Sequence, residues 1–316
     1  MSKVLIEVKD VKKYYPVKNK RTLKALDGVS LDVYDGEVLG VVGESGCGKS
    51  TLGKCIMSLA EVTEGSIALD GKDISGLNRK EKKDMRRRMQ MVFQNPFSSF
   101  NPKFSIGRSL TMVGKFYGMS PEQVRKRLEE LLAVISLDKS VLNRMPGELS
   151  GGQLQRLAIA RALIPNPEFI LADEPVSALD VSVQAQILNL ILDLRSQYQQ
   201  TMMFISHDLP VVEHICDRVV VMYLGSIMEM GTVDDLFSHT AHPYTQALLA
   251  AKPKENPDIV KEEIRLEGDV PNALNMPTGC KFHTRCPLAK KGLCDIKVPE
   301  LKEVSAGHTV ACHFAE

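Results

Sequence analysis

The sequence lacks any apolar run that approaches the roughly 20 residues needed to cross a bilayer. The best candidate, residues 219–224, is short and follows Asp217 and Arg218, so it is interpreted as a buried strand. A signal peptide is not indicated either, because the N-terminus reaches charged residues within its first few positions. We therefore expect a cytosolic protein, and any role at a membrane would require a partner.

An excess of charge of either sign is also missing. Lysine and arginine number 40 against 39 aspartates and glutamates, which gives a net charge of +1. No bulk attraction to nucleic acid or anionic lipid is expected from this balance, and no nucleic-acid partner is predicted. Phosphate binding would have to come from local geometry. Hydrophobic residues make up 44% of the chain, enough for a sizeable core.

Most of the chain alternates short apolar runs with helical patterns. Strands are predicted at residues 38–42, 65–69, 89–93, 169–172 and 202–205. A helix is predicted over residues 121–135, with Ser120 as its N-cap. Uninterrupted apolar strands are typical of a sheet covered on both faces. Strand–helix alternation therefore predicts an α/β domain with a mostly parallel core.

The composition changes near residue 252. Residues 252–267 are polar and contain two prolines, and helical periodicity is weak beyond them. We expect one domain over residues 1–251, followed over residues 252–316 by a linker and a small cysteine-rich module. Four of the seven cysteines lie in this last part, namely Cys280, Cys286, Cys294 and Cys312. In a reducing cytosol such a cluster indicates metal ligation rather than disulfides.

A glycine-rich stretch follows the predicted strand 38–42. Residues 43–50 fit the pattern G-x-x-x-x-G-K-S, in which glycines let backbone N–H groups surround phosphates at a helix N-terminus. Lys49 should reach the β- and γ-phosphates, and Ser50 should bind Mg²⁺. The residues expected to contact the nucleotide here are Gly43, Glu44, Ser45, Gly46, Cys47, Gly48, Lys49, Ser50 and Thr51.

Two acidic residues end the predicted strand 169–172. The carboxyl ends of strands in open α/β sheets are where ligands bind. Asp173 is expected to hold Mg²⁺ through water, and Glu174 to act as the general base that polarises the attacking water. Taken alone, a solvated acidic pair after a strand is an equal alternative.

Residues 149–153 read Leu-Ser-Gly-Gly-Gln, the signature of the ABC ATPase family, and the chain resembles that family over residues 3–250. The resemblance implies a P-loop RecA-like core, an N-terminal antiparallel β subdomain, and a helical subdomain at about 95–163 that carries the signature. It also implies ATP as the ligand. The positions that match other family motifs are Gln94 (Q-loop, a further Mg²⁺ ligand), Asp180 (D-loop), His207 (switch histidine) and Tyr15 (adenine stacking, with Tyr14 as the alternative).

The signature would form a second anion site at a helix N-terminus. In the family this site acts in trans, so that each ATP lies between the phosphate loop of one subunit and the signature of the other. The resemblance therefore implies a dimer with two composite sites. The residues that would act in trans are Ser150, Gly151, Gly152, Gln153 and Asp180.

Three further segments resemble the oligopeptide/dipeptide importer branch of the family. They are residues 15–21, residues 95–102 and residues 242–245 followed by the cysteine-rich tail. The resemblance is greatest to the F-type, the second of two related ATPase subunits. It implies a heterodimer, two membrane permeases, an extracytoplasmic solute-binding protein, and a place at the cytoplasmic face of the membrane. A nickel or oligosaccharide importer, a soluble non-transport ABC ATPase and a metal-sensing regulator are alternatives.

Two regions keep alternative interpretations. The aromatic residues of segment 97–117 are either a surface for docking permeases or the core of the helical subdomain. The four clustered cysteines would suit a [4Fe-4S] cluster, which takes four thiolates, and the importer branch has the same terminal pattern. Zinc is the alternative, although none of the gaps is a short C-x2-4-C knuckle.

Overall fold

A computed structural model describes residues 3–17, 21–251 and 268–315. These residues divide into two compact units. Unit 1 combines residues up to Ser75 with those from Ser206 onward, and unit 2 spans Gly76–Ile205. No helix among the described residues is long and apolar enough to cross a membrane. The polar stretch 252–267, interpreted above as a linker, lies outside the described residues.

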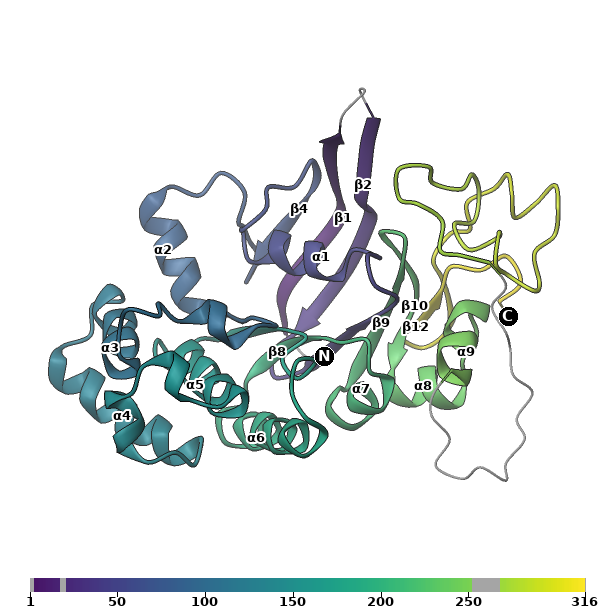
Figure 1. The fold of residues 1–316 in the computed structure, drawn as a ribbon. Helices are drawn as coiled ribbons and strands as arrows, with labels where there is room; N and C mark the ends of the chain where they lie inside the picture. The colour runs from purple at the N-terminus through teal and green to yellow at the C-terminus, as the bar shows by residue number, and fades with distance from the viewer. Residues whose placement is uncertain (1–2, 18–20, 252–267, 316) are drawn as a thin grey trace. The chain divides into compact units, whose positions relative to one another are not determined.

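Unit 1 contains two sets of strands (Figure 1). An antiparallel sheet has the order β2-β1-β4-β5, and a second set runs β11-β12-β10-β9-β3. The strands of unit 1 are β1 (Val4–Val17), β2 (Arg21–Tyr34), β3 (Val38–Val42), β4 (Glu64–Leu69), β5 (Lys72–Asp73), β9 (Arg218–Tyr223), β10 (Ser226–Thr232), β11 (Lys302–Ser305) and β12 (His308–Val310). Its helices are α1 (Lys49–Ile56), α7 (Leu209–Ile215), α8 (Val233–Ser238) and α9 (Pro243–Ala250).

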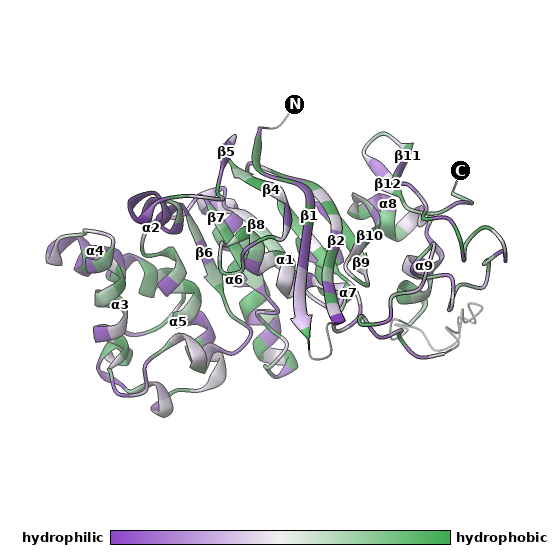
Figure 2. Ribbon diagram, turned by 90° about the horizontal axis from the view of Figure 1, so that it is seen from above, coloured by the Kyte–Doolittle hydropathy of each residue, from purple (hydrophilic) through white to green (hydrophobic). Residues whose placement is uncertain are grey.

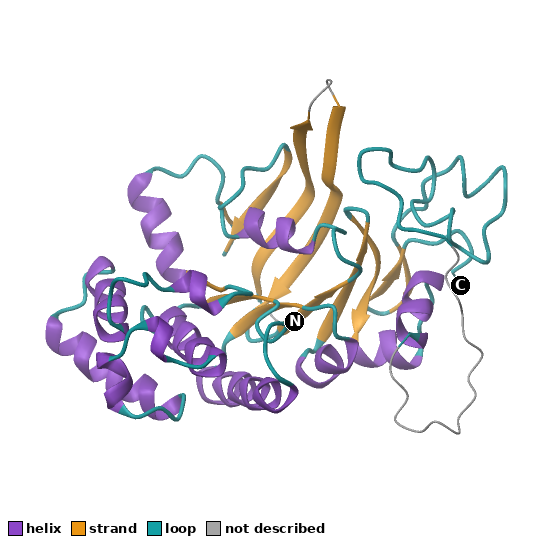
Figure 3. Cartoon of the chain, viewed as in Figure 1, coloured by secondary structure: helices purple, strands orange, loops and turns teal. Residues whose placement is uncertain are grey.

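Unit 2 contains the parallel strands β8-β7-β6 and most of the helices (Figure 3). Ile170 of β7 lies opposite Gln90 on one side and Met202 on the other. The strands are β6 (Met89–Val92), β7 (Phe169–Asp173) and β8 (Thr201–Ile205). The helices are α2 (Arg79–Arg88), α3 (Ile106–Phe116), α4 (Pro121–Val134), α5 (Gly151–Leu163) and α6 (Val181–Tyr198), with 3-10 turns at Pro96–Ser99, Lys139–Asn143 and Pro146–Glu148.

Hydrophobic patterning explains which elements are buried. Every residue of β3, β7 and β8 is buried, as expected for uninterrupted apolar strands. Helix α2 carries charge on nearly every residue and buries only Met85, and it is coloured mostly purple in Figure 2. Helix α4 begins as the sequence predicts, because Ser120 and Gln123 form a reciprocal capping box.

The C-terminal residues extend the sheet of unit 1 rather than standing apart from it. Strand β12 pairs antiparallel with β10, and Glu229 lies opposite Val310. The carboxylate of Glu229 is fully buried and accepts hydrogen bonds from the backbone N–H groups of Ala241 (2.8 Å) and His242 (3.1 Å). Its third partner is His308 Nε2 at 2.8 Å. One carboxylate thus joins β10, β12 and the start of α9.

His242 is the N-cap of α9 and is 1% exposed. Its Nδ1 accepts a hydrogen bond from the backbone N–H of Tyr244 at 3.0 Å, so the ring is held in its neutral form. Burial lowers the pKa of His242 to about 4. A neutral histidine is therefore part of the folded state at this position.

We expect this histidine to make stability depend on pH. The unfolded chain takes up the proton at a pKa of about 6.5, whereas the folded chain resists it down to about 4. Stability from His242 is therefore complete above about pH 6.5 and falls by roughly 3 kcal/mol as the pH drops toward 4. Asparagine can also cap a helix but does not titrate. Urea unfolding from pH 7.5 to 4.5 should show a shallower pH slope for His242→Asn than for wild type. Equal slopes would contradict the assignment.

Candidate active site

The phosphate loop of unit 1 connects the buried strand β3 to helix α1. Lys49, the first residue of α1, is 5% exposed, and its Nζ donates to the carbonyl oxygens of Gly43 (2.7 Å) and Glu44 (3.1 Å). The N-cap, Gly48, has no side chain to bond the first N–H groups of the helix. The strand, loop and helix predicted from the sequence are confirmed, with a lysine as the first residue of the helix.

Close backbone packing explains the first glycine of the loop. Gly43 has a φ of 148°, and a Cβ at this position would lie 2.2 Å from the carbonyl oxygen of Met222 in β9. Further along the loop, the carbonyl oxygen of Cys47 accepts a hydrogen bond from the N–H of Gly225 at 2.8 Å. The phosphate loop is therefore held against the β9–β10 turn by its main chain.

The two tyrosines considered for adenine stacking differ in their contacts. The hydroxyl of Tyr14 donates to Asp27 Oδ1 at 2.6 Å, which ties this side chain to β2. Burial raises the pKa of Tyr15, and the nearby thiol of Cys55 in α1 adds to the shift. Tyr15 is therefore the tyrosine on the side of α1, the helix that begins with Lys49.

Unit 2 contains three of the expected site residues: Glu174, predicted as the catalytic base, and Gln94 and Asp173, predicted as Mg²⁺ ligands. Asp173 ends β7 and is 8% exposed, and Glu174 follows it with a φ of 46°, in the left-handed region. Gln94 Nε2 donates to Glu174 Oε2 at 2.8 Å and lies 3.3 Å from Ser177 Oγ. The amide nitrogen of Gln94 thus serves Glu174, and its carbonyl oxygen is the atom that a hard cation such as Mg²⁺ would bind. Ser177 was not predicted as a site residue.

The signature residues lie at the N-terminus of α5. Ser150 Oγ accepts from the N–H of Gln153 (3.3 Å), and Gln153 Oε1 accepts from the N–H of Ser150 (3.1 Å). Gly152 allows α5 to approach α6, since a Cβ there would lie 2.5 Å from Val183 Cγ1. Asp180 is exposed and caps α6 without a side-chain hydrogen bond.

His207 belongs to unit 1, where it lies exposed just before α7 begins. The hydroxyl of the preceding residue, Ser206, accepts a hydrogen bond from the backbone N–H of Asp208 at 2.9 Å. This turn holds the backbone around the histidine. The prediction of a loop histidine after the strand 202–205 is confirmed in position, and its role stays a prediction.

The aromatic segment 97–117 divides between core and surface. Phe100 is buried at 4% exposure, whereas Phe97 and Phe116 are 50% and 55% exposed. A cavity of about 430 Å³ in unit 2 is lined in part by Phe116. Its walls include Gln90, Phe104, Met112, Phe116, Tyr117 and Arg161. The segment therefore contributes to both the core and the exposed surface of unit 2, and its role in docking permeases stays a prediction.

The metal site expected at the C-terminus is not formed in the structure. Within residues 3–17, 21–251 and 268–315, no group of three or more His, Cys, Asp or Glu side chains could hold a metal ion. All four cysteines are free thiols. Burial raises the pKa of Cys280 to about 11, and the thiols of Cys286, Cys294 and Cys312 add to this shift. The effect of the other three thiols on Cys280 indicates that the four cysteines lie in one neighbourhood.

Two contacts to the phosphate loop are not predicted by the sequence. Arg285 Nη1 and Nη2 donate to Glu44 Oε2 (2.8 Å) and Oε1 (3.1 Å), and Tyr244 Oη accepts from the N–H of Glu44 at 3.0 Å. These partners lie 241 and 200 residues from Glu44. Tyr244 belongs to the tetrapeptide 242–245 noted above, which was the one available signal. No local pattern indicates Arg285.

A phosphate loop, a strand ending in two carboxylates and a helix-borne signature define a P-loop ATPase of the ATP-binding-cassette class. Models of two families match this chain: "ABC transporter" over residues 26–177, and "Oligopeptide/dipeptide transporter, C-terminal region" over residues 228–294. The oligopeptide transport ATP-binding protein AppF of Bacillus subtilis (strain 168) is 48% identical over 98% of this chain and 97% of its own. OppF of Escherichia coli (strain K12), which bears the same description, is 45% identical over 98% and 96%.

Solved structures agree with the fold. The ATP-binding cassette MJ0796, in a dimeric post-hydrolysis state bound to ADP and Pi, aligns with a TM-score of 0.66 at 33% identity, over 72% of this chain and 99% of that one. CbiO1 from Clostridium perfringens, part of the transporter complex cbiONQ, aligns with a TM-score of 0.67 at 26% identity, over 75% and 92%. The chain belongs to the ABC transporter family, in the branch of the oligopeptide/dipeptide transport ATP-binding proteins. It is an ATPase with the ABC fold.

The packing of the phosphate loop predicts different tolerance at two of its glycines. Gly43→Ala would place a methyl group 2.2 Å from Met222 O, so the loop must move away from β9. Gly46 has a φ of 79°, and a methyl group added there would meet no atom within 4 Å, so Gly46→Ala adds only backbone strain of about 1–2 kcal/mol. We expect Gly43→Ala to abolish binding of a fluorescent ATP analogue and Gly46→Ala to retain measurable binding. Equal affinities in the two variants would contradict this packing.

Proposed function

We propose that this chain is the ATP-hydrolysing subunit that energises an importer for di- or oligopeptides. The relatives with nearly full coverage are named as oligopeptide transport ATP-binding proteins. Residues 228–294 match the C-terminal region of oligopeptide/dipeptide transporters, which favours this solute class over nickel or oligosaccharides. The proposal rests on the similarity to peptide-transport ATP-binding proteins over nearly the whole chain, together with the phosphate loop of unit 1.

ATP binding and hydrolysis are assigned to the residues that match the family motifs. Residues 43–51 and the Lys49 ammonium bind the phosphates, and Tyr15 stacks on adenine. Mg²⁺ supplies charge neutralisation of the phosphates when bound, and Ser50, Gln94 and Asp173 offer the oxygen ligands that suit it. Glu174 accepts a proton from the attacking water. Its carboxylate is oriented by Gln94, whose Nε2 donates to Glu174 Oε2 at 2.8 Å. His207 responds to the γ-phosphate.

Hydrolysis is proposed to require two ATPase subunits. Ser150 and Gln153 form a capping box at the N-terminus of α5, and Gly151 and Gly152 carry no side chains there. Such a terminus attracts a phosphate presented by a second subunit. Asp180 of the D-loop would face the same partner. The partner is proposed to be a related, non-identical ATPase.

The exposed aromatics of unit 2 are proposed to bind the permeases. Phe97 and Phe116 are 50% and 55% exposed, and Phe116 lines the cavity together with Phe104 and Tyr117. An exposed apolar patch at the rim of a cavity is typical of a protein–protein contact. Its occupants would be the cytoplasmic helices of two permease subunits, which hold this chain at the cytoplasmic face of the membrane. A solute-binding protein would deliver the peptide from outside.

The division of the chain and the role of its tail are also proposals. We place the nucleotide-binding domain at residues 1–251, with its helical subdomain at about 95–163, and the linker and cysteine-rich module at residues 252–316. Cys280, Cys286, Cys294 and Cys312 would bind a [4Fe-4S] cluster, or zinc as the alternative. The mutual effect of their thiols on the pKa of Cys280 supports the proposal, because ligands of one centre must be neighbours.

The assignment of the base predicts separate effects for two substitutions. Glu174→Gln keeps the side-chain shape beside Gln94 but cannot accept the proton, so ATPase turnover should fall by at least about 100-fold while ATP affinity is retained. Lys49→Ala removes a charge aimed at the phosphates and should weaken ATP binding itself. Titration with ATP and single-turnover hydrolysis would separate the two. The control is Glu122→Gln, an exposed acid of α4. Wild-type hydrolysis by Glu174→Gln would refute the assignment.

The metal proposal predicts a composition that can be measured. Protein purified without oxygen should contain iron and sulfide in equal amounts and be brown, and the variant Cys286→Ser should lose most of the iron. Stoichiometric zinc in colourless protein would establish the alternative. Cys216→Ser is the control, since this thiol lies at the end of α7, outside the tail. Four titratable thiols in anaerobic, metal-free protein would refute both metals.

A further inference from the structure

Two basic residues of the C-terminal region lie four positions apart and are both largely buried. The side chains of Lys281 and Arg285 are 12% and 7% exposed. Each is paired with an acid from the N-terminal part of unit 1: Lys281 with Asp27 and Arg285 with Glu44. A buried cation needs such a partner, because burial without one costs several kcal/mol. The segment 281–285 is therefore attached to the nucleotide-binding half of the unit by charge.

Arg285 holds Glu44, the second residue of the phosphate loop. Its guanidinium makes a two-bond contact with the carboxylate, at 2.8 and 3.1 Å, and Nη1 also lies 3.5 Å from the hydroxyl of Tyr223. The contact with Glu44 raises the pKa of Arg285 above its ordinary value. Such a bidentate pair fixes direction as well as distance. The Glu44 side chain is thereby turned toward the C-terminal segment.

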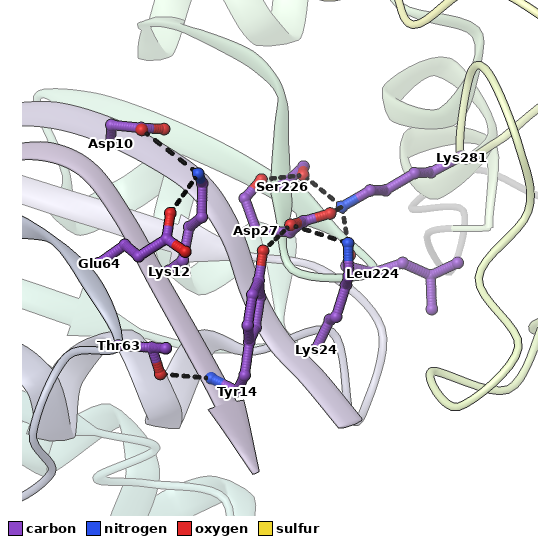
Figure 4. Close-up of polar contacts among 10 residues, drawn as sticks. All are labelled: Asp10, Lys12, Tyr14, Lys24, Asp27, Thr63, Glu64, Leu224, Ser226 and Lys281. Carbon is purple, nitrogen blue, oxygen red and sulfur yellow. Dashed lines mark hydrogen bonds and ion pairs between the residues drawn. The ribbon is translucent and has the colours of Figure 1, made fainter. Parts of the chain in front are cut away.

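Lys281 makes a matching contact at the sheet that carries Tyr15 (Figure 4). Its Nζ donates to Asp27 Oδ2 (3.0 Å), Ser226 Oγ (2.7 Å) and the carbonyl oxygen of Leu224 (3.1 Å). Three acceptors use the three N–H donors of a lysine ammonium. Asp27 Oδ1 in turn accepts from the hydroxyl of Tyr14, the neighbour of Tyr15 (2.6 Å). The same segment thus reaches both the phosphate loop and the strand next to the proposed adenine site.

We propose that segment 281–285 is a positioning element for ATP binding, in which Arg285 neutralises and orients Glu44 and Lys281 holds the β1–β2 pair at Asp27. The proposal rests on the assignment of residues 43–51 as the phosphate-binding loop. Glu44 places a carboxylate on a loop that must bind a triphosphate. Like charges at a few ångströms repel by about 1 to 4 kcal/mol, depending on solvent screening. Arg285 removes this repulsion without contacting the nucleotide.

A charge effect and a purely structural contact predict different outcomes for a double substitution. We expect Arg285→Ala to leave Glu44 unpaired and to raise the Kd for ATP by about tenfold, with kcat unchanged within about twofold. Glu44→Gln removes the repelling charge, so Glu44→Gln/Arg285→Ala should return to near wild-type affinity. Arg285→Lys keeps the charge but loses the two-bond geometry, and its Kd should lie between wild type and Arg285→Ala.

The experiment is a titration of the full-length chain with a fluorescent ATP analogue, with KM and kcat measured on the assembled transporter. Lys291→Ala is the matched control, because it removes one positive charge from an exposed position of the same region. Equal Kd values for Arg285→Ala and Lys291→Ala would overturn the proposal. A double variant that binds ATP as weakly as Arg285→Ala would also overturn the proposal, because that result would indicate a structural contact.

If Arg285→Ala does not fold, a wild-type Kd in Arg285→Lys together with a weaker Kd in the double variant would overturn the proposal as well. Lys49→Ala separates the two levels: retained ATP binding in that variant refutes the loop assignment itself.

Discussion

The buried carboxylate of Glu229 is the interaction on which the C-terminal half of unit 1 depends. A carboxylate at 0% exposure is tolerable only if its oxygens are bonded, and here three donors from two separate segments supply those bonds. Those donors fix the start of α9 and strand β12 against β10. Helix α9 then carries Tyr244 to the backbone of Glu44. A single desolvated charge in the sheet thus determines where the phosphate loop finds its support.

A phosphate loop needs support of this kind because its own chemistry denies it internal bonds. Its N–H groups must stay available for an anion, so few of them can form hydrogen bonds within the loop. The structure supplies the missing restraint from outside: Gly225 N–H bonds Cys47 O, and Tyr244 and Arg285 hold Glu44. Lys49 adds bonds to the carbonyl oxygens of Gly43 and Glu44. The loop is therefore restrained both from within, by Lys49, and by residues that lie far away along the chain.

Sequence reasoning succeeded where a feature is encoded within a few neighbouring residues. The apolar runs of β3 and β7, the capped start of α4 at Ser120 and the helix after residue 150 all follow from spacing and local hydrogen-bonding needs. It failed where the partner lies about 200 residues away. Nothing near Arg285 indicates that it faces Glu44, and nothing near Phe97 and Phe100 separates the exposed ring from the buried one. Pairing across the chain is a property of the folded topology.

Glu174 shows why position and chemistry must be considered together. A non-glycine residue at a φ of 46° is held in a conformation that costs of order 1–3 kcal/mol and persists only where its surroundings impose it. Here the N–H of Glu174 donates to Ile205 O at 3.0 Å, and its carboxylate accepts from Gln94. The backbone turn directs the carboxylate away from the strand line that Asp173 continues. Two adjacent acids thereby acquire different surroundings, one buried at the strand end and one half-exposed beside an amide.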